Sequence, residues 1–250
     1  MPWIDSHCHL DYLPDPPNAM ARAEENDIRH WILPGTDPSQ WQRTQHRFER
    51  DPRVHLAFGH HPWFLPEHDA EMGVLSRQLD DSTTVVAIGE TGLDYYNGQP
   101  KRPPADHQEA WFEQHLRLAQ DRNLPVIIHA VKAHDRVLHY LKQYPRVTGV
   151  IHAFSGPYEQ AMAYIDKGWR LGCGSLILKS GKTRDAFARI PADRLLLETD
   201  APDMRPKHPV HTIPLLDLLQ TADDLAEARG VTTADLMAQT SANTRTLFGI

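Results

Sequence analysis

Two histidines separated by one residue, His7 and His9, end the short apolar stretch WIDSHCHL at residues 3–10. In a β-strand, residues i and i+2 project from the same face, whereas in a helix they point to different sides. If this stretch is a strand, two imidazoles leave its carboxyl end together, which amounts to half of a metal site. Cys8, between them, then faces away from both, and we expect it to pack in the core.

Ligand-type side chains also end other β-rich runs of the sequence. The remaining candidates are Glu90, His129, His152 and Asp200, together with the pair His60 and His61. Imidazoles and carboxylates gathered from separate strands are costly to bury unless a cation holds them. The six residues His7, His9, Glu90, His129, His152 and Asp200 exceed one tetrahedral site and fit two ions that share a bridging carboxylate or water. We therefore expect two divalent ions (Mg²⁺, Mn²⁺ or Zn²⁺), and we expect His60, His30 and Cys173 to be packing residues.

The elements that position these residues alternate along the chain. Eight β-rich runs occur at 3–10, 30–36, 54–62, 85–94, 125–130, 149–156, 169–178 and 195–202. Helical periodicity predicts helices in 107–123, 157–168 and 212–230, and a closing helix in the tail 232–250. Strands alternating with helices predict a parallel sheet. Eight such units in 250 residues favour a single α/β domain, 1–250, with a closed (β/α)₈ (TIM) barrel whose site lies at the carboxyl ends of the strands. An open doubly wound sheet is the alternative.

Composition narrows the class of protein. No apolar run is long enough for a membrane span, and no secretory signal is visible, so we expect no membrane association. Two cysteines form no disulfide framework, which predicts a cytoplasmic location. The net charge of −7 argues against a broad basic nucleic-acid surface but leaves room for a local phosphate site.

The motifs DSHCHL, GHHP, GETGLDYY, LPVIIHA, VIHAFSG and LLETDAP, in this order, resemble those of the TatD family of metal-dependent hydrolases. The trailing NTRTLFG also resembles that family, so the similarity spans essentially the whole chain. The stretch SGKTRDAFARIPADRLLLETDAPDM is most similar to the YjjV-type branch. The resemblance implies a (β/α)₈ barrel of the amidohydrolase-like group and metal-dependent DNA hydrolysis, often as a 3′→5′ exonuclease.

The resemblance also implies roles for the candidate metal ligands. His7 and His9 match the first metal pair, Glu90 the carboxylate shared between the ions, and His129 and His152 the second pair.

Further roles follow from the same resemblance. Asp200 matches the aspartate that binds metal and orients the attacking water, and His61 matches a histidine near the substrate phosphate, so Asp200, Glu90 and His61 are the expected catalytic residues. Asp5 and Asp94 lie in matching motifs and either fix imidazole orientations or serve as buried turn carboxylates.

The expected substrate contacts are less specific. Many family members carry an arginine where this chain has Val131, and an asparagine where it has Thr212. The candidate phosphate-binding residues are His61, Lys132, Arg205 and Lys207, and the candidate base-stacking rings are Trp63, Tyr95, Tyr96 and Phe154.

The predicted function is a divalent-metal-dependent deoxyribonuclease that cleaves phosphodiester bonds at single-stranded DNA ends with a metal-activated water. No obligate protein partner is inferred. Two alternatives remain: a hydrolase of a small amide, lactone or phosphoester, and a non-catalytic binding barrel.

Overall fold

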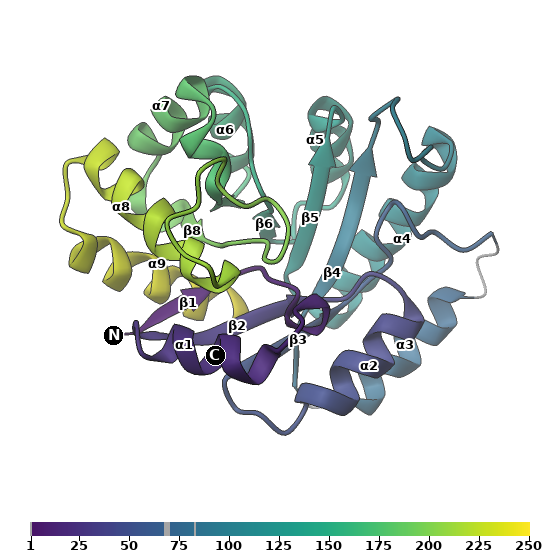
Figure 1. Cartoon of the computed structure of the whole chain (residues 1–250). Helices are drawn as coiled ribbons and strands as arrows, with labels where there is room; N and C mark the ends of the chain where they lie inside the picture. Colours follow the sequence, from purple (N-terminus) through teal and green to yellow (C-terminus); the bar gives the residue numbers. More distant parts are fainter. Residues whose placement is uncertain (1, 68–70, 83) are drawn as a thin grey trace. The chain divides into compact units, whose positions relative to one another are not determined.

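Eight parallel strands form one sheet in which the strand order follows the chain from β1 to β8. The computed structural model describes residues 2–67, 71–82 and 84–250 (Figure 1). The strands are β1 (Trp3–Asp5), β2 (Ile28–Pro34), β3 (Val54–Phe58), β4 (Val85–Asp94), β5 (Val126–Val131), β6 (Gly149–Ile151), β7 (Arg170–Cys173) and β8 (Leu195–Leu197). The backbone N–H of Ser6 donates to the Leu197 carbonyl (3.0 Å), which links the end of β1 to β8. The chain has the predicted (β/α)₈ barrel fold.

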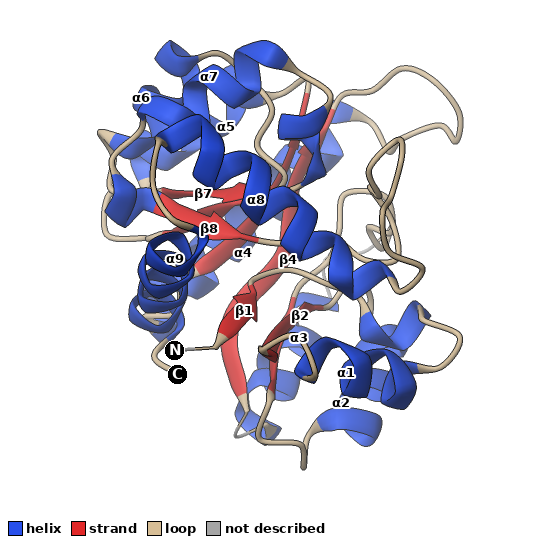
Figure 2. Cartoon of the chain, turned by 60° about the vertical axis from the view of Figure 1, so that its left-hand side comes forward, coloured by secondary structure: helices blue, strands red, loops and turns tan. Residues whose placement is uncertain are grey.

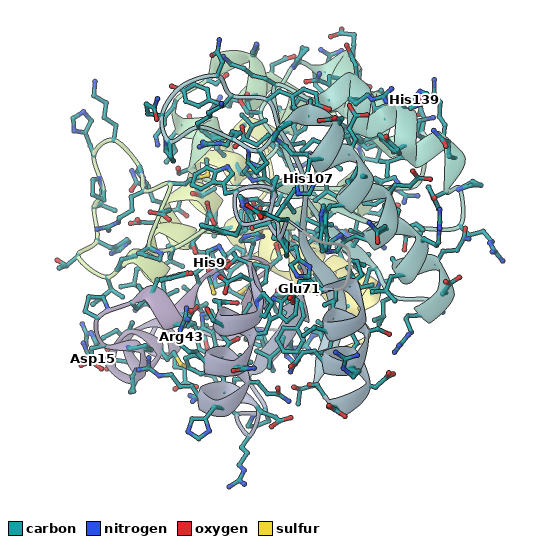
Figure 3. The ribbon with its side chains drawn as sticks, turned by 90° about the vertical axis from the view of Figure 1, so that its right-hand side faces the viewer. His9, Asp15, Arg43, Glu71, His107 and His139 are labelled. Carbon is teal, nitrogen blue, oxygen red and sulfur yellow. The ribbon has the colours of Figure 1, made fainter. Side chains whose placement is uncertain are left out.

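Helices connect successive strands, and the last two follow β8. They are α1 (Pro16–Glu24), α2 (Pro38–Phe48), α3 (Glu71–Asp81), α4 (Ala105–Arg122), α5 (His134–Gln143), α6 (Tyr158–Ile165), α7 (Gly181–Arg189), α8 (Asp217–Arg229) and α9 (Thr233–Phe248). Short 3₁₀ helices are η1 (Leu10–Tyr12), η2 (Ser175–Leu178), η3 (Ala192–Arg194) and η4 (Pro214–Leu216). Polar caps explain several starts: the Asp15 carboxylate, labelled in Figure 3, accepts a hydrogen bond from the Asn18 N–H (3.2 Å). The predicted helices correspond to α4, α6, α8 and α9, and α8 ends at Gly230, whose φ of 65° suits glycine.

The chain divides into two compact units, and the first comprises Met1–Leu33 and His152–Ile250. Here β7 and β8 lie side by side (Figure 2), and Gly172 pairs with Leu196. Helix α9 is fixed to this part of the sheet, because Asn243 donates to the Leu195 carbonyl (2.8 Å) and Ser241 donates to the Pro2 carbonyl (2.8 Å).

The second unit, Pro34–Ile151, holds β3 to β6. Gly92 on β4 pairs with His129 on β5, and a Cβ at Gly92 would overlap the His129 carbonyl oxygen. Glycine at this position therefore lets the two strands approach where β5 carries a candidate ligand. The single domain 1–250 stays a prediction.

Three of the four residues expected to pack are fully buried. Cys8 and Cys173 are fully buried. The His60 ring is also buried, with its centroid 4.8 Å from that of Trp41 and 4.7 Å from that of Trp111. Burial lowers the pKa of His60 to about 3, so its imidazole is neutral at physiological pH. His30 lies on β2 and is half-buried.

No helix in the described part of the chain combines the length and the apolar character needed to cross a membrane.

One ionic cluster on α4 gives a prediction for stability. The Glu109 carboxylate accepts hydrogen bonds from Arg136, from the Tyr95 hydroxyl (2.5 Å) and from the Tyr140 hydroxyl (3.0 Å). The Arg136 bond, followed by the tyrosine bonds, lowers the pKa of Glu109 to about 2. A carboxyl with a lowered folded-state pKa stabilises the fold above its unfolded-state pKa and loses that contribution as pH falls.

Glu109→Gln should therefore destabilise the protein most near pH 6 or above, and the difference from wild type should shrink as pH falls toward about 2. Urea unfolding across this range measures the difference. The exposed Glu67→Gln is the control and should show no such trend. A difference for Glu109→Gln that is independent of pH would contradict the assignment.

Candidate metal centre

The Asp200 carboxylate is the meeting point of three imidazoles in the first compact unit. Its Oδ1 lies 3.5 Å from His7 Nε2 and 3.4 Å from Nε2 of His9, which Figure 3 labels. Its Oδ2 lies 3.7 Å from His152 Nε2. We call these four residues the Asp200 group, and all four are among the six predicted ligands.

The route by which His7 and His9 reach this group differs from the prediction. Strand β1 ends at Asp5, so the expectation that both histidines project from one face of a strand was wrong. The Asp5 carboxylate ends the strand because it accepts the N–H of His7 (3.3 Å) and the N–H (3.0 Å) and hydroxyl (2.6 Å) of Thr199. Burial raises the pKa of Asp5 to about 7, although the Thr199 bonds oppose this. The bonds shown for Asp5 are therefore those of a buried turn carboxylate.

Backbone hydrogen bonds hold the two ligand segments together. The Asp200 N–H donates to the His7 carbonyl (2.9 Å), and the His9 N–H donates to the Ala201 carbonyl (2.7 Å). Asp200 has a φ of 59°, a left-handed conformation that aspartate and asparagine tolerate better than most residues. The positions of the carboxylate and the imidazoles are thus set by the fold itself.

The surroundings of Asp200 keep its carboxyl group in the charged form. Burial alone would raise the pKa of Asp200, but the charge of His152 and a hydrogen bond from His9 outweigh it and lower the pKa to about 2. Asp200 is therefore ionised at neutral pH, as a metal ligand needs to be.

Glu198 is a functional candidate that the sequence reasoning missed. Its Oε1 lies 2.9 Å from His152 Nδ1 and accepts the Ala153 N–H (2.6 Å). If His152 Nδ1 donates to this carboxylate, the Nε2 lone pair faces Asp200 and is available to a metal. The pocket for Glu198 exists because residue 172 on β7 is glycine: a Cβ there would overlap the carboxylate. The signal in the sequence was a glutamate directly after the apolar β8, two residues before Asp200.

Truncating Glu198 to alanine should weaken metal binding by about 10- to 100-fold, because His152 would lose the partner that fixes its orientation. Glu198→Gln keeps an acceptor oxygen and should lose much less. Titration of the metal-free variants with Mn²⁺ or Zn²⁺, followed by calorimetry, measures both affinities, and circular dichroism checks their fold. Equal losses in the two variants would contradict the role of a hydrogen-bonding partner and indicate a direct ligand instead.

A second group of candidate ligands lies in the second compact unit. Glu90, within β4, places its Oε1 3.0 Å from His129 Nδ1 on β5 and 3.6 Å from His61 Nε2. The Glu90 and His61 side chains are buried and that of His129 is 14% exposed. We call these three residues the Glu90 group.

Asp94 has the same relation to His129 that Glu198 has to His152. Its Oδ2 lies 3.3 Å from His129 Nε2, and it also accepts bonds from Trp63 Nε1 (2.5 Å) and Arg102 Nε (3.0 Å). Burial would raise the pKa of Asp94, but the bonds from His129 and Trp63 outweigh it and hold the pKa well below its usual range. A proton on His129 Nε2 shared with Asp94 leaves the Nδ1 lone pair facing Glu90. Asp94 thus contacts the imidazole of His129, which is the contact that an imidazole-orienting role for it requires.

His61 is arranged differently from the other histidines. Its Nδ1 accepts a hydrogen bond from the Trp63 N–H (3.2 Å), so in the neutral ring Nε2 carries the proton. In this form Nε2–H is a donor that suits contact with a phosphate oxygen, and Nε2 would be available to a metal only without that proton.

The predicted phosphate-binding cations have distinct surroundings. Lys132 is exposed, directly after β5, and its Nζ lies 5.0 Å from the centre of the Tyr96 ring. Lys207 is also exposed. Arg205 instead donates to Asp217 (2.6 Å), the first residue of α8, and to the His211 carbonyl (2.6 Å), so much of its guanidinium is already hydrogen-bonded within the protein.

The residues present fit divalent ions. Among the described residues, there are three sets whose own donor atoms all lie within 4.8 Å of one another: His7, His9 and Asp200; His7, His152 and Glu198; and His61, Glu90 and His129. Imidazole nitrogens mixed with carboxylate oxygens are the donors that Zn²⁺, Mn²⁺ and related ions prefer.

Comparisons with known proteins agree with this chemistry. The family model described as TatD related DNase matches residues 4–249. The chain is 34% identical over 247 residues to the uncharacterized metal-dependent hydrolase YjjV of Escherichia coli, covering 90% of this chain and 94% of the relative. It is 34% identical over 251 residues to the 3′-5′ ssDNA/RNA exonuclease TatD of Erwinia amylovora, covering 94% of each chain.

The solved structures give the same result. The crystal structure of the E. coli YjjV protein, a TatD homolog, superposes with a TM-score of 0.91 at 32% identity, covering 99% of this chain and 98% of the other. The match over nearly the full length, with donor sets suited to divalent ions, shows that this chain belongs to the TatD family of metal-dependent hydrolases.

Proposed function

We propose that this protein is a divalent-metal-dependent nuclease that hydrolyses phosphodiester bonds from the 3′ ends of single-stranded DNA. The observation that carries the proposal is the presence of two groups of buried imidazoles and carboxylates, the Asp200 group and the Glu90 group. Relatives about one-third identical, named as 3′-5′ ssDNA/RNA exonucleases, support the choice of substrate.

We propose that two divalent ions would be held by the predicted ligands, which are His7, His9, Glu90, His129, His152 and Asp200. When bound, the ions supply Lewis acidity that promotes ionisation of water and offsets negative charge on the phosphoryl group. Glu198 and Asp94 hold His152 and His129 with one ring nitrogen turned toward the ligand groups.

The chain's own residues move protons and position the substrate. Asp200, ionised at neutral pH, accepts the proton of the attacking water and orients that water toward the phosphorus. His61 donates its Nε2–H to a phosphate oxygen, and Lys132 adds a positive charge nearby. Arg205 and Lys207 stay predicted substrate contacts.

Single-stranded ends fit the charge of the protein better than long duplex DNA. With a net charge of −7, the chain offers few phosphate contacts to a duplex, so duplex binding should be weak and sensitive to salt. A strand end needs only a few local contacts. The two free, buried cysteines accord with the cytoplasmic location that we propose.

Digestion of 3′- and 5′-labelled single-stranded DNA, duplex DNA and RNA, with Mn²⁺ or Mg²⁺ added, tests the proposal. We expect a 5′-labelled single strand to shorten progressively, a 3′-labelled strand to release its label at once as a mononucleotide, and duplex DNA to react slowly. Hydrolysis of small esters, amides or lactones in the same assay with no action on oligonucleotides would replace the nuclease by the small-substrate alternative. No hydrolysis of any substrate would favour the binding barrel.

A further inference from the structure

A cluster of exposed rings and cations lies beside the Glu90 group. Trp63 and Tyr96 are 41% and 42% exposed, so solvent reaches both side chains beside the cations. Arg102 lies over the Trp63 ring, with its Cζ 4.0 Å from the ring centre, and 5.6 Å from the Tyr96 ring centre. We call Trp63, Tyr96, Arg102 and Lys132 the Trp63–Tyr96 surface.

The buried Asp94 carboxylate anchors the Trp63 ring and the backbone of Tyr96. Trp63 Nε1 donates to Asp94 (2.5 Å), and the Tyr96 N–H donates to the same carboxylate (2.9 Å). Arg102 Nε also donates to Asp94 (3.0 Å), so one buried carboxylate fixes two ring-bearing segments and the cation between them. Because the Trp63 ring is already fixed, it loses little conformational entropy when a ligand stacks on it.

The charge of this surface favours an anion. Arg102 pairs with the Asp94 carboxylate (3.0 Å), while Lys132 is exposed and makes no ion pair with any residue in 2–67, 71–82 or 84–250. Among the charged groups Asp94, Arg102 and Lys132, the sum is therefore positive, in a chain whose net charge is −7. Lys132 has a φ of 53° and places its ammonium 5.0 Å from the centre of the Tyr96 ring.

The surface also adjoins the candidate chemistry. The Trp63 ring centre is 5.2 Å from that of His61 and 6.3 Å from that of His129. The other two aromatic candidates lie elsewhere: Phe154 is buried against Tyr164 and Phe187, and the Tyr95 hydroxyl donates to Glu109.

We propose that the Trp63–Tyr96 surface is a nucleotide-binding subsite, in which a base of single-stranded nucleic acid stacks on the exposed rings and Lys132 contacts its phosphate. Exposed rings beside cations bind bases of any sequence through their π-faces, while the cations bind the backbone. The subsite rests on the proposed nuclease function and specifies how the strand end is held beside the Glu90 group. It predicts recognition of single strands with little base preference.

The test measures binding of the full-length, Mn²⁺-loaded protein to single-stranded oligothymidylate with phosphorothioate linkages, which resist hydrolysis. The comparison ligand is an oligonucleotide of equal length and charge whose 3′-terminal positions are abasic. Wild type should bind the ligand with bases about 5- to 100-fold more tightly. Tyr96→Leu should reduce this ratio to less than about threefold, whereas Tyr96→Phe should preserve it because the ring remains.

Two further variants complete the test. Tyr158→Leu is a matched control on α6, since Arg189 lies 3.8 Å over the Tyr158 ring in the same way, and it should keep the wild-type ratio. Lys132→Gln should weaken both ligands alike and reduce the slope of log K against log salt by about 0.7. No base preference in wild type, a Tyr96→Leu ratio equal to wild type, or an unchanged slope for Lys132→Gln would each overturn the subsite.

Hydrolysis of ordinary oligonucleotides, assayed separately, distinguishes this failure from failure of the proposed function. A base preference without hydrolysis keeps the subsite and removes the nuclease. Hydrolysis without a base preference keeps the nuclease and removes the subsite.

Discussion

Asp200→Asn should lower kcat for single-stranded DNA hydrolysis by about a thousandfold, the scale on which enzymes lose rate with a general base. Asp200 lies within 3.7 Å of His7, His9 and His152, and its low pKa keeps it ionised at neutral pH. Asparagine is nearly the same shape and tolerates the φ of 59°, so the change removes the charge and the proton acceptor while the backbone is kept. Steady-state kinetics at saturating metal measures the loss.

The exposed carboxylate of Asp203 provides the control, because Asp203→Asn changes the net charge equally and should leave kcat within about twofold of wild type. Unfolding curves should show that Asp200→Asn remains folded. If folded Asp200→Asn retained more than a tenth of the wild-type kcat with full metal occupancy, Asp200 would not be the proton acceptor.

Removing divalent ions with a chelator should abolish hydrolysis, and adding Mn²⁺, Mg²⁺ or Zn²⁺ should restore it. The expected loss is at least about a thousandfold, since bound ions contribute several kcal/mol to transition-state stabilisation. The chelated protein should stay folded, because backbone bonds from Asp200 to His7 and from His9 to Ala201 position the ligand segments without an ion. Activity assays and thermal unfolding of the same chelated sample measure both effects.

Undiminished activity in protein shown by elemental analysis to be metal-free would contradict the metal-dependent mechanism. Loss of activity together with loss of fold would instead assign the ions a structural role. If several ions restored the activity of the wild-type protein to different extents, those extents would rank the candidates for the physiological metal.

The fold followed from the sequence because local pattern and global architecture agree. Each β-rich run became a strand, and glycines ended helices where periodicity predicted, as at Gly230 after α8. Alternating strands and helices leave few topologies for a chain of this length. The open doubly wound sheet is excluded by the bond that joins Ser6 to Leu197.

The ends of the strands were predicted less well, because side chains compete with strand partners for backbone N–H groups. Asp5 accepts the N–H groups of His7 and Thr199, so β1 stops before the histidines that drew attention to it. Periodicity of apolar residues carries no information about such a side-chain acceptor. The two imidazoles still meet, but at Asp200 and through a turn.

The ligand candidates were visible as residue types, whereas the groups that orient them were not. Glu198 directly follows an apolar strand and is identified only by its contact with His152 and by the space that Gly172 leaves. Arg102 lies in a proline-rich loop, and its position between Trp63 and Tyr96 depends on tertiary contacts. Contacts between residues far apart in the sequence leave no periodic signal.

The most direct test of the central claim is the number of divalent ions bound per chain. Elemental mass spectrometry measures this number in wild type, His152→Ala and His129→Ala. The two histidines belong to different donor groups. We predict about two ions per wild-type chain and a lower number in each variant. Wild-type protein equilibrated with Mn²⁺ or Zn²⁺ that retained no ion, or variants that bound as many as wild type, would contradict the account.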